Sequence, residues 1–223
     1  MSDKTTKHAG LWRRLVGFGF RLLYHEMAWS YDLVAWLVSL GQWRAWRQTA
    51  LPHLVGERVL ELGHGPGHLL VALAERGFRP VGLDVSPQMG QLARRRLRRA
   101  GLTPPLVHAR AQTLPFAAHS FDSVAATFPT AYIVDPATLK EVARVLRPGG
   151  RLVVVVGAQL CGQDPLCRFV EWLYFITGQR EAAGDWGAPF AAAGLKTSRV
   201  QVEMKRSRVW LLVAERATPN DRR

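Results

Sequence analysis

Residues 59–69 read Val59-Leu60-Glu61-Leu62-Gly63-His64-Gly65-Pro66-Gly67-His68-Leu69, and this stretch decides the fold. It predicts a short buried strand, then a glycine-rich turn, then the start of a helix. Glycine at alternate positions lets the backbone turn sharply and lets a ligand approach it closely. In open α/β sheets, a turn of this kind at the carboxyl end of a strand binds nucleotide-like ligands. We therefore expect a ligand-binding loop here.

Alternating strand and helix patterns follow this loop. We expect strands at residues 58–62, 79–84, 106–109, 121–127 and 151–156, and helices at 67–76, 87–100, 136–146 and 166–177. Two last strands, 195–203 and 207–215, are separated by a short turn, which is typical of an antiparallel hairpin. Strands that alternate with helices predict a parallel sheet covered on both faces. The fold class is therefore α/β, a doubly wound sheet of seven strands, mostly parallel with an antiparallel C-terminal hairpin.

The chain divides into three parts. Residues 1–50 are expected to form N-terminal helices that act as a lid, residues 51–217 the α/β domain, and residues 218–223 a disordered tail. Within the first part, residues 11–23 are basic and aromatic. Such a segment either lies in a membrane interface or packs on the surface of its own domain, and the sequence leaves both open. No apolar run approaches the roughly 18 residues that span a bilayer.

The net charge of +13 favours anionic partners. The arginine-rich run 94–99 has three interpretations. In order of preference they are a solvated helix face, a surface that binds lipid headgroups and a surface that binds RNA. No RNA-recognition motif accompanies it, so we do not expect nucleic acid as a partner. Cys161 and Cys167 match neither a disulfide framework nor a zinc pattern. They predict reduced thiols in a cytoplasmic protein, with no metal site.

The spacing of the glycines in this loop narrows the choice of ligand. A dinucleotide fingerprint places its third glycine at position 68, which is His68 here. Glu61 would repel a pyrophosphate, whereas it suits the positive sulfonium and amino groups of S-adenosylmethionine. Asp84 closes the second strand, where a carboxylate accepts hydrogen bonds from ribose hydroxyls, although a turn or cap role is the alternative. Met89, one helical turn on, is expected to pack against adenine.

Four blocks then resemble the class I S-adenosylmethionine-dependent methyltransferases of the type 11 group, which have a Rossmann-like fold. They are VLELGHGPGHL, GLDVSPQM, AQTLPFAAHSFDSV and EVARVLRPGGRLVVV, within residues 59–156. The resemblance implies that the acidic residue and glycines of the loop surround the methionine part of the cofactor: Glu61, Gly63, Gly65 and Gly67. It implies that Asp84 binds the ribose and that Ala111 and Gln112 flank the adenine. Arg110 stands where the family usually has an acidic residue.

The segment 31–47 is similar to the corresponding part of the ubiquinone/menaquinone biosynthesis methyltransferases, and bacterial phospholipid N-methyltransferases share its Tyr-Asp opening. The resemblance implies a small lipophilic acceptor, quinol-like or a phospholipid headgroup. Together with the basic, aromatic segment 11–23, this predicts a cytoplasmic enzyme that is peripheral on the inner face of an anionic membrane. Two alternatives remain: a non-catalytic S-adenosylmethionine-binding module, and an RNA methyltransferase on the strength of charge alone.

The candidate catalytic residues are His68, His64, Tyr132 and Tyr31. The two histidines lie in or beside the loop, Tyr132 follows the fourth strand, and Tyr31 comes from the lid. None of them is singled out as a general base. The tryptophans at positions 36, 43 and 46 are interpreted as packing residues rather than as a substrate box.

Overall fold

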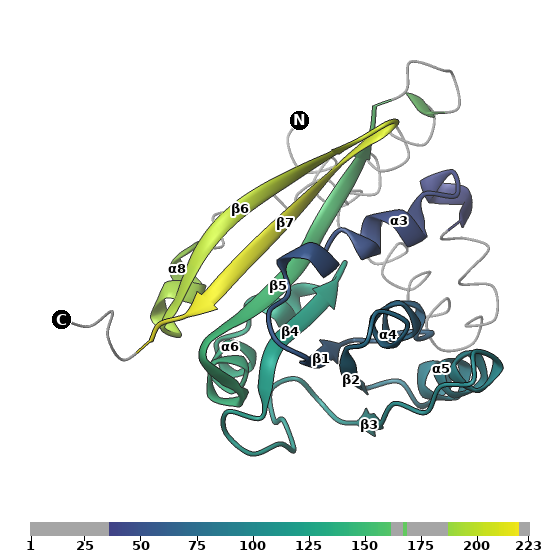
Figure 1. Ribbon diagram of the computed structural model, residues 1–223. Coiled ribbons are helices and arrows are strands. Elements are labelled where there is room, and N and C mark those ends of the chain that lie inside the picture. Colours follow the sequence, from purple (N-terminus) through teal and green to yellow (C-terminus); the bar gives the residue numbers. More distant parts are fainter. Residues whose placement is uncertain (1–35, 162–166, 169–186, 219–223) are drawn as a thin grey trace, which may run out of the picture.

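The computed structural model describes residues 36–161, 167–168 and 187–218. A sheet of seven strands runs through these residues in the order β3-β2-β1-β4-β5-β7-β6 (Figure 1). β1 to β5 are parallel, and β7 is antiparallel to both of its neighbours, β5 and β6. The strands are β1 (Arg58–Leu62), β2 (Arg79–Asp84), β3 (Leu106–His108), β4 (Phe121–Thr127), β5 (Leu146–Leu160), β6 (Leu195–Met204) and β7 (Ser207–Arg216). The predicted fold class is confirmed.

Helices cover both faces of the sheet (Figure 1). On one face lie α3 (Trp43–Gln48), the short η2 (Leu51–His53), α4 (His68–Ala74) and α5 (Pro87–Arg99), and on the other η3 (Ala131–Val134), α6 (Pro136–Val145) and α8 (Gly187–Ala192). Alternate residues of β5 serve the two faces: Val153 and Val155 pack with Trp46 of α3, whereas Leu152 and Val154 pack with α6 and α8. Full burial of such a side chain contributes about 1.5–3 kcal/mol. The central strands therefore anchor both helical layers.

β5 is longer than the sequence predicts. We expected a strand at 151–156 after a turn at Arg147-Pro148-Gly149-Gly150, but β5 spans Leu146–Leu160. Leu146 already pairs with Phe121, and the register then shifts so that Ser123 pairs with Arg151. The turn is thus a bulge inside the strand. At the other end, a shift around Gly157 is bridged by pairing with β7, which carries the strand on to Leu160.

The expected N-terminal helical region is interrupted where the structure describes it. Residues 36–39 are helical, then Leu40 and Gly41 take φ of 49° and 80°, and α3 follows. Residues 1–35, including Tyr31, lie outside the described residues. So do most of the expected helix at 166–177 and all of the expected tail except Thr218. Cys161 is exposed and Cys167 is buried, and both are free thiols.

Local signals fix the helices that follow the site strands. Ser86 caps α5 by accepting a hydrogen bond from the Met89 amide at 3.3 Å, and Asp135 caps α6 through the Ala137 amide at 2.9 Å. Each cap precedes a proline at the first helical position, as such caps favour. Among the described residues, no helix has both the length and the apolar character needed to cross a membrane.

Candidate functional site

The glycine loop lies at the carboxyl end of β1, where the strand order reverses between β1 and β4. This switch point is where open α/β sheets bind ligands. The amides of Gly63 and His64 donate to the Leu83 carbonyl of β2 at 2.7 and 3.2 Å. The Gly67 amide donates back to His64 at 3.0 Å. Backbone hydrogen bonds therefore hold the loop against β2 and close its own turn.

The three glycines of the loop have φ of +66°, +52° and +80°, and each has different surroundings. A Cβ on Gly67 would lie 2.9 Å from the Ala93 Cβ, so this glycine lets α4 approach α5. A Cβ on Gly63 would lie 2.8 Å from the Tyr132 hydroxyl. A Cβ on Gly65 would meet nothing within 4 Å, so the backbone is open there. Gly65 is thus the point where a ligand has room to approach.

Glu61 is buried beneath this loop, and the residue is only 1% exposed. Burial raises its pKa well above the ordinary value, while Arg47 opposes the shift and Asp84 adds to it. The Leu70 amide donates to the carboxylate, but Oε2 has no hydrogen-bond partner. A buried carboxylate oxygen without a partner is costly. It fits a site whose missing partner is a cationic group of a ligand.

Asp84 closes β2, and both of its carboxylate oxygens accept backbone hydrogen bonds. Oδ2 accepts from the Gly65 amide at 2.8 Å, and Oδ1 accepts from the Ser86 amide at 2.8 Å. Asp84 therefore does have the turn role that was the alternative interpretation. Each oxygen keeps a further lone pair, so the carboxylate can still accept other hydrogen bonds, as the expected ribose role requires.

Met89 is 1% exposed, so adenine packing by this side chain would require movement around it. Val85 directly follows Asp84 at the carboxyl end of β2 and is 57% exposed, so of the two side chains it is the one that a ligand can contact without rearrangement.

Ala111 and Gln112 lie in the loop between β3 and β4. Ala111 is buried, and Gln112 Nε2 donates to Asp135 Oδ2 at 3.0 Å. That hydrogen bond, with the Ala137 amide and the charge of Arg110, holds the pKa of Asp135 below its ordinary value. Gln112 therefore ties the adenine-side loop to the cap of α6.

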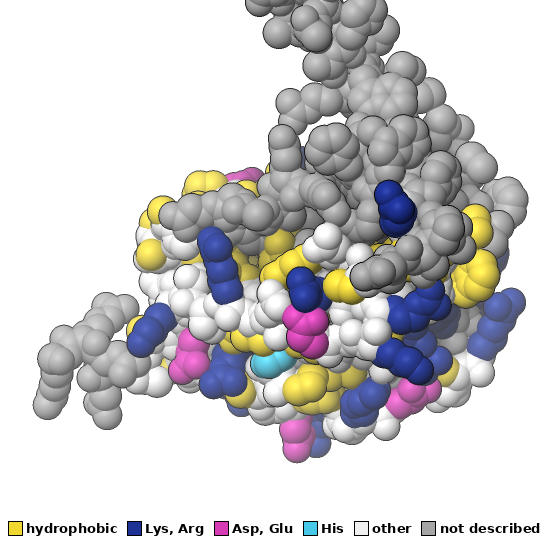
Figure 2. Space-filling view, turned by 90° about the horizontal axis from the view of Figure 1, so that it is seen from above, with side chains coloured by type: hydrophobic (Ala, Val, Ile, Leu, Met, Phe, Trp, Pro, Cys, Tyr) yellow, Lys and Arg dark blue, Asp and Glu magenta, His cyan; other side chains and the backbone are white. Residues whose placement is uncertain are grey.

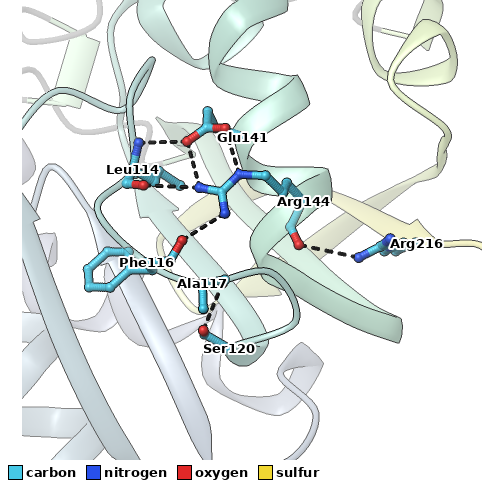
Figure 3. Close-up of polar contacts among 7 residues, drawn as sticks. All are labelled: Leu114, Phe116, Ala117, Ser120, Glu141, Arg144 and Arg216. Carbon is cyan, nitrogen blue, oxygen red and sulfur yellow. Dashed lines mark hydrogen bonds and ion pairs between the residues drawn. The ribbon is translucent and has the colours of Figure 1, made fainter.

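A second contact between α6 and this loop is the clasp formed by Glu141 and Arg144 (Figure 3). Arg144 donates to the carbonyls of Phe116 and Leu114 at 2.7 and 3.0 Å, and Glu141 accepts from the Leu114 amide at 2.7 Å. The two side chains also form a bidentate pair, with distances of 2.7 and 2.8 Å. Bonds from Arg144 lower the pKa of Glu141. The clasp fixes residues that follow Gln112.

The candidate catalytic residues that the structure describes have different surroundings. His64 is 4% exposed, and its Nδ1 lies 2.7 Å from the Gly65 carbonyl. Burial lowers its pKa, although the Asp84 carboxylate opposes this. His68 begins α4 and is partly exposed. Tyr132 donates from its hydroxyl to the Leu62 carbonyl at 3.2 Å and lies close to Gly63. His64 thus supports the loop from inside, whereas Tyr132 borders it from η3.

An aromatic cluster at the end of β4 was only partly anticipated. Trp43 stacks on Phe128 with ring centroids 4.3 Å apart, and Trp46 is 1% exposed, as its packing interpretation predicts. Trp36, by contrast, is 59% exposed. Phe128 has a φ of 50°, a left-handed conformation that a bulky residue rarely adopts and that often marks functional sites. Within the described residues, no group of three or more His, Cys, Asp or Glu side chains is placed to hold a metal ion.

Comparison with known proteins agrees with this geometry. Residues 59–150 match the family described as "Methyltransferase domain". This part of the chain is therefore similar to methyltransferase domains. The matched residues include the loop, Asp84, Ala111 and Gln112, but not α3.

Curated relatives named demethylmenaquinone methyltransferase match a slightly longer part of the chain. The protein of Clavibacter sepedonicus is 38% identical over 136 residues, which cover 59% of this chain and 55% of the relative. That of Thermus thermophilus is 38% identical over 139 residues, covering 60% and 63%. The chain thus matches less than two thirds of the length of these relatives.

Solved structures share the fold at low identity. Geranyl diphosphate C-methyltransferase from Streptomyces coelicolor has a TM-score of 0.59 at 16% identity, covering 78% of this chain and 79% of that one. The [4+2]-cyclase SpnF has a TM-score of 0.57 at 17% identity, covering 78% and 80%. The same fold thus supports different reactions, so the function has to be inferred from the residues of the site.

Proposed function

We propose that the protein transfers a methyl group from S-adenosylmethionine to a small lipophilic acceptor. The observation that carries the proposal is the buried Glu61 carboxylate, whose Oε2 has no partner, beneath a loop that is open at Gly65. Glu61 would hold the amino group of the cofactor, Asp84 its ribose and Val85 its adenine. When bound, the cofactor supplies an electrophilic methyl group on a sulfonium for in-line displacement.

The chain's own task is then to align the acceptor and exclude water. Tyr132 of η3 lies against Gly63 of the loop, and we place the acceptor on this side. Phe128 directly follows β4 and packs on Trp43. The hydroxyl of Tyr132 is engaged with the Leu62 carbonyl, so its role in this proposal is to shape the acceptor wall. His68 remains the candidate base among the described residues for an acceptor that must lose a proton.

A quinol-like acceptor is supported by the relatives, which are named demethylmenaquinone methyltransferase. The geranyl diphosphate enzyme, crystallised with its substrate and S-adenosyl-L-homocysteine, has a lipophilic acceptor on the same fold. A phospholipid headgroup is the second acceptor class that the N-terminal segment implies. Both are presented at a membrane surface.

Helix α5 supports action at the cytoplasmic face of an anionic membrane. Arg94, Arg95, Arg98 and Arg99 are exposed, and Pro87–Arg99 contains no acidic residue. Basic side chains gather on the side of the molecule where α5 lies (Figure 2). Arginines near anionic lipids favour binding, and salt weakens it. Replacing all four with Gln in the full chain should reduce co-sedimentation with anionic vesicles at least tenfold, and unchanged binding would contradict this part of the proposal.

The decisive assay is transfer of a labelled methyl group to a bacterial lipid extract, with mass spectrometry of the product. We expect a labelled quinone, and expect Asp84→Ala to abolish labelling. Labelled phospholipid would move the acceptor to the second class. Binding of S-adenosylmethionine without any labelled product would favour a non-catalytic module, and labelled RNA would favour the remaining alternative.

A further inference from the structure

Helix α5 joins the glycine loop to the basic surface of the molecule. Its inner side carries Met89, Ala93 and Leu97, which recur at helical spacing and are buried. Arg96 lies on this side as well, three residues after Ala93, and donates a hydrogen bond to the Pro66 carbonyl of the loop. The other arginines of the helix are exposed on its opposite side: Arg94, Arg95, Arg98 and Arg99. One element therefore presents an arginine to the loop and further arginines to the solvent.

The loop contacts α5 along the length of the helix. At its beginning, the Asp84 carboxylate accepts from the Gly65 amide and from the amide of Ser86, the residue that caps α5. In its middle, a Cβ on Gly67 would lie 2.9 Å from the Ala93 Cβ, so the two backbones lie close together. The bond between Arg96 and Pro66 comes from the last turn. Because helix ends fray, this contact depends on how well the last turn is formed.

Like charges on α5 oppose the formation of that last turn. Pro87–Arg99 contains five arginines and no acidic residue. Arginines three or four residues apart on a helix repel each other, as Arg95 and Arg99 do, and Arg96 and Arg99. Anions on the exposed side of α5 would screen this repulsion without competing for Arg96, whose bond to Pro66 lies on the inner side. Neutralisation of the exposed arginines should therefore strengthen the contact with the loop.

The surface around these arginines suits an anionic lipid bilayer. The helical turn 36–39 lies on the same side of the sheet as α5 (Figure 1), and its Trp36 and Leu37 are 59% and 51% exposed. Hydrophobic side chains border Lys and Arg side chains on this side of the molecule (Figure 2). A bilayer can meet both features, because its headgroups attract arginines and its interface accepts apolar side chains.

We propose that α5 couples membrane binding to cofactor binding: an anionic bilayer on its exposed arginines keeps Arg96 on the glycine loop and so raises the affinity for the cofactor. Arg96 is a positioning residue in this inference, since it acts through the Pro66 backbone. The inference rests on the proposed function, which supplies the cofactor and the membrane, and it adds the regulation of the one by the other. The protein then binds its cofactor best where a lipophilic acceptor is available.

Calorimetry with S-adenosylhomocysteine tests the coupling, because this ligand binds without reacting. The affinity of the full chain is measured with vesicles of phosphatidylglycerol and phosphatidylcholine, and with vesicles of phosphatidylcholine alone. We expect the anionic vesicles to raise the affinity roughly three- to tenfold, since the relief of each like-charge pair is a modest effect. Coupling is reciprocal, so the ligand should raise the affinity for anionic vesicles by the same factor in co-sedimentation.

Variants of α5 separate the contact with the loop from the charge of the helix. Arg96→Met keeps the apolar stem but lacks the donor, so it should still bind the vesicles while the gain in ligand affinity falls below about twofold. Arg96→Lys can donate to the Pro66 carbonyl and should keep part of the gain. Arg95→Met is the matched control, because it removes an exposed charge from the same helix and leaves the loop contact, and it should keep most of the gain.

Each possible failure has its own meaning. Equal gains in the wild type and in Arg96→Met would overturn the role of Arg96, and no gain in the wild type would overturn the coupling; both results leave methyl transfer standing. A gain with a short RNA and none with anionic vesicles would overturn the bilayer as the partner. A wild-type chain that does not bind S-adenosylhomocysteine under either condition would overturn the proposed function, and this inference with it.

Discussion

Two buried or half-buried glutamates in this molecule each face an arginine, and they differ in what surrounds them. Glu141 and Arg144 direct their polar atoms at each other and at the 114–116 backbone, and the pKa of Glu141 is lowered. The charge of Arg47 favours the ionised form of Glu61, but burial raises the pKa of Glu61 overall. Its Oε2 has no hydrogen-bond partner. The first arrangement is complete within the fold. The second leaves a buried carboxylate oxygen without a partner, and we propose that a ligand supplies it.

The largest expected effect is on cofactor affinity. Glu61→Gln should weaken S-adenosylhomocysteine roughly 150- to 4,000-fold, because removing one partner of a buried ion pair costs about 3–5 kcal/mol. Its unfolding free energy should stay the same or rise, because an uncompensated buried charge is removed. Calorimetry and urea denaturation measure the two quantities. The matched variant Glu141→Gln should bind the ligand normally, and a comparable loss there would erase the distinction between the two glutamates.

A change in the Glu141–Arg144 clasp should affect stability more than ligand affinity. Arg144→Met removes the bonds to Leu114, Phe116 and Glu141, and should lower the unfolding free energy by about 1–3 kcal/mol, with the lower part favoured because the arginine is partly exposed. Thermal unfolding should shift down by roughly 2–10 °C for a chain of this size. Affinity for the ligand should change only a few-fold. A variant as stable as the wild type would show that the clasp is incidental.

Glu61 and Glu141 should contribute with opposite sign to the change of unfolding free energy with pH. The raised pKa of Glu61 means that the folded state holds its proton longer, so its ionisation lowers stability as pH rises from about 4.5 to the folded-state pKa. The lowered pKa of Glu141 means that its contribution is present above about 4.5 and is lost as pH falls through the folded-state pKa. Urea denaturation from pH 4 to 8 should show that Glu61→Gln gains on the wild type as pH rises, by at most about 1.4 kcal/mol per pH unit. A constant difference between the two curves would contradict the raised pKa.

The smallest effect concerns Tyr132. Tyr132→Phe loses one hydrogen bond to the Leu62 carbonyl, which should lower the unfolding free energy by about 0.5–1.5 kcal/mol. Methyl transfer should fall only a few-fold, because the residue shapes a wall. A loss of 100-fold or more in the transfer rate, with normal cofactor affinity, would instead make Tyr132 a catalytic residue.

The fold was predictable where a signal was local. The alternating glycines, the caps at Ser86 and Asp135 and the apolar strands are visible in sequence, and β1, β2 and β4 have the predicted bounds. β5 was misjudged because Arg147-Pro148-Gly149-Gly150 looks like a turn, and only pairing with β4 and β7 keeps those residues inside a strand. Pairing between distant strands leaves no local mark.

The site was predictable to the same extent. Glu61 and Asp84 were recognisable from their spacing to the glycines, but the inward orientation of His64 and the burial of Met89 depend on packing against other elements. Arg47 of α3 acts through its charge on Glu61, although the two residues are far apart in sequence. The four resembling blocks do not include α3, so this interaction could be found only in the structure.

The most direct test of the central claim is the affinity of the full chain for S-adenosylhomocysteine at pH 8 and at pH 5, measured by calorimetry beside Glu61→Gln. His64 is present in both proteins, so a pH dependence that it alone produces would appear in both. We expect one-to-one binding at pH 8 that weakens toward pH 5 in the wild type, as Glu61 takes up a proton, and weak binding with little of this pH dependence in the variant. Equal affinities of the two proteins at both pH values would contradict it.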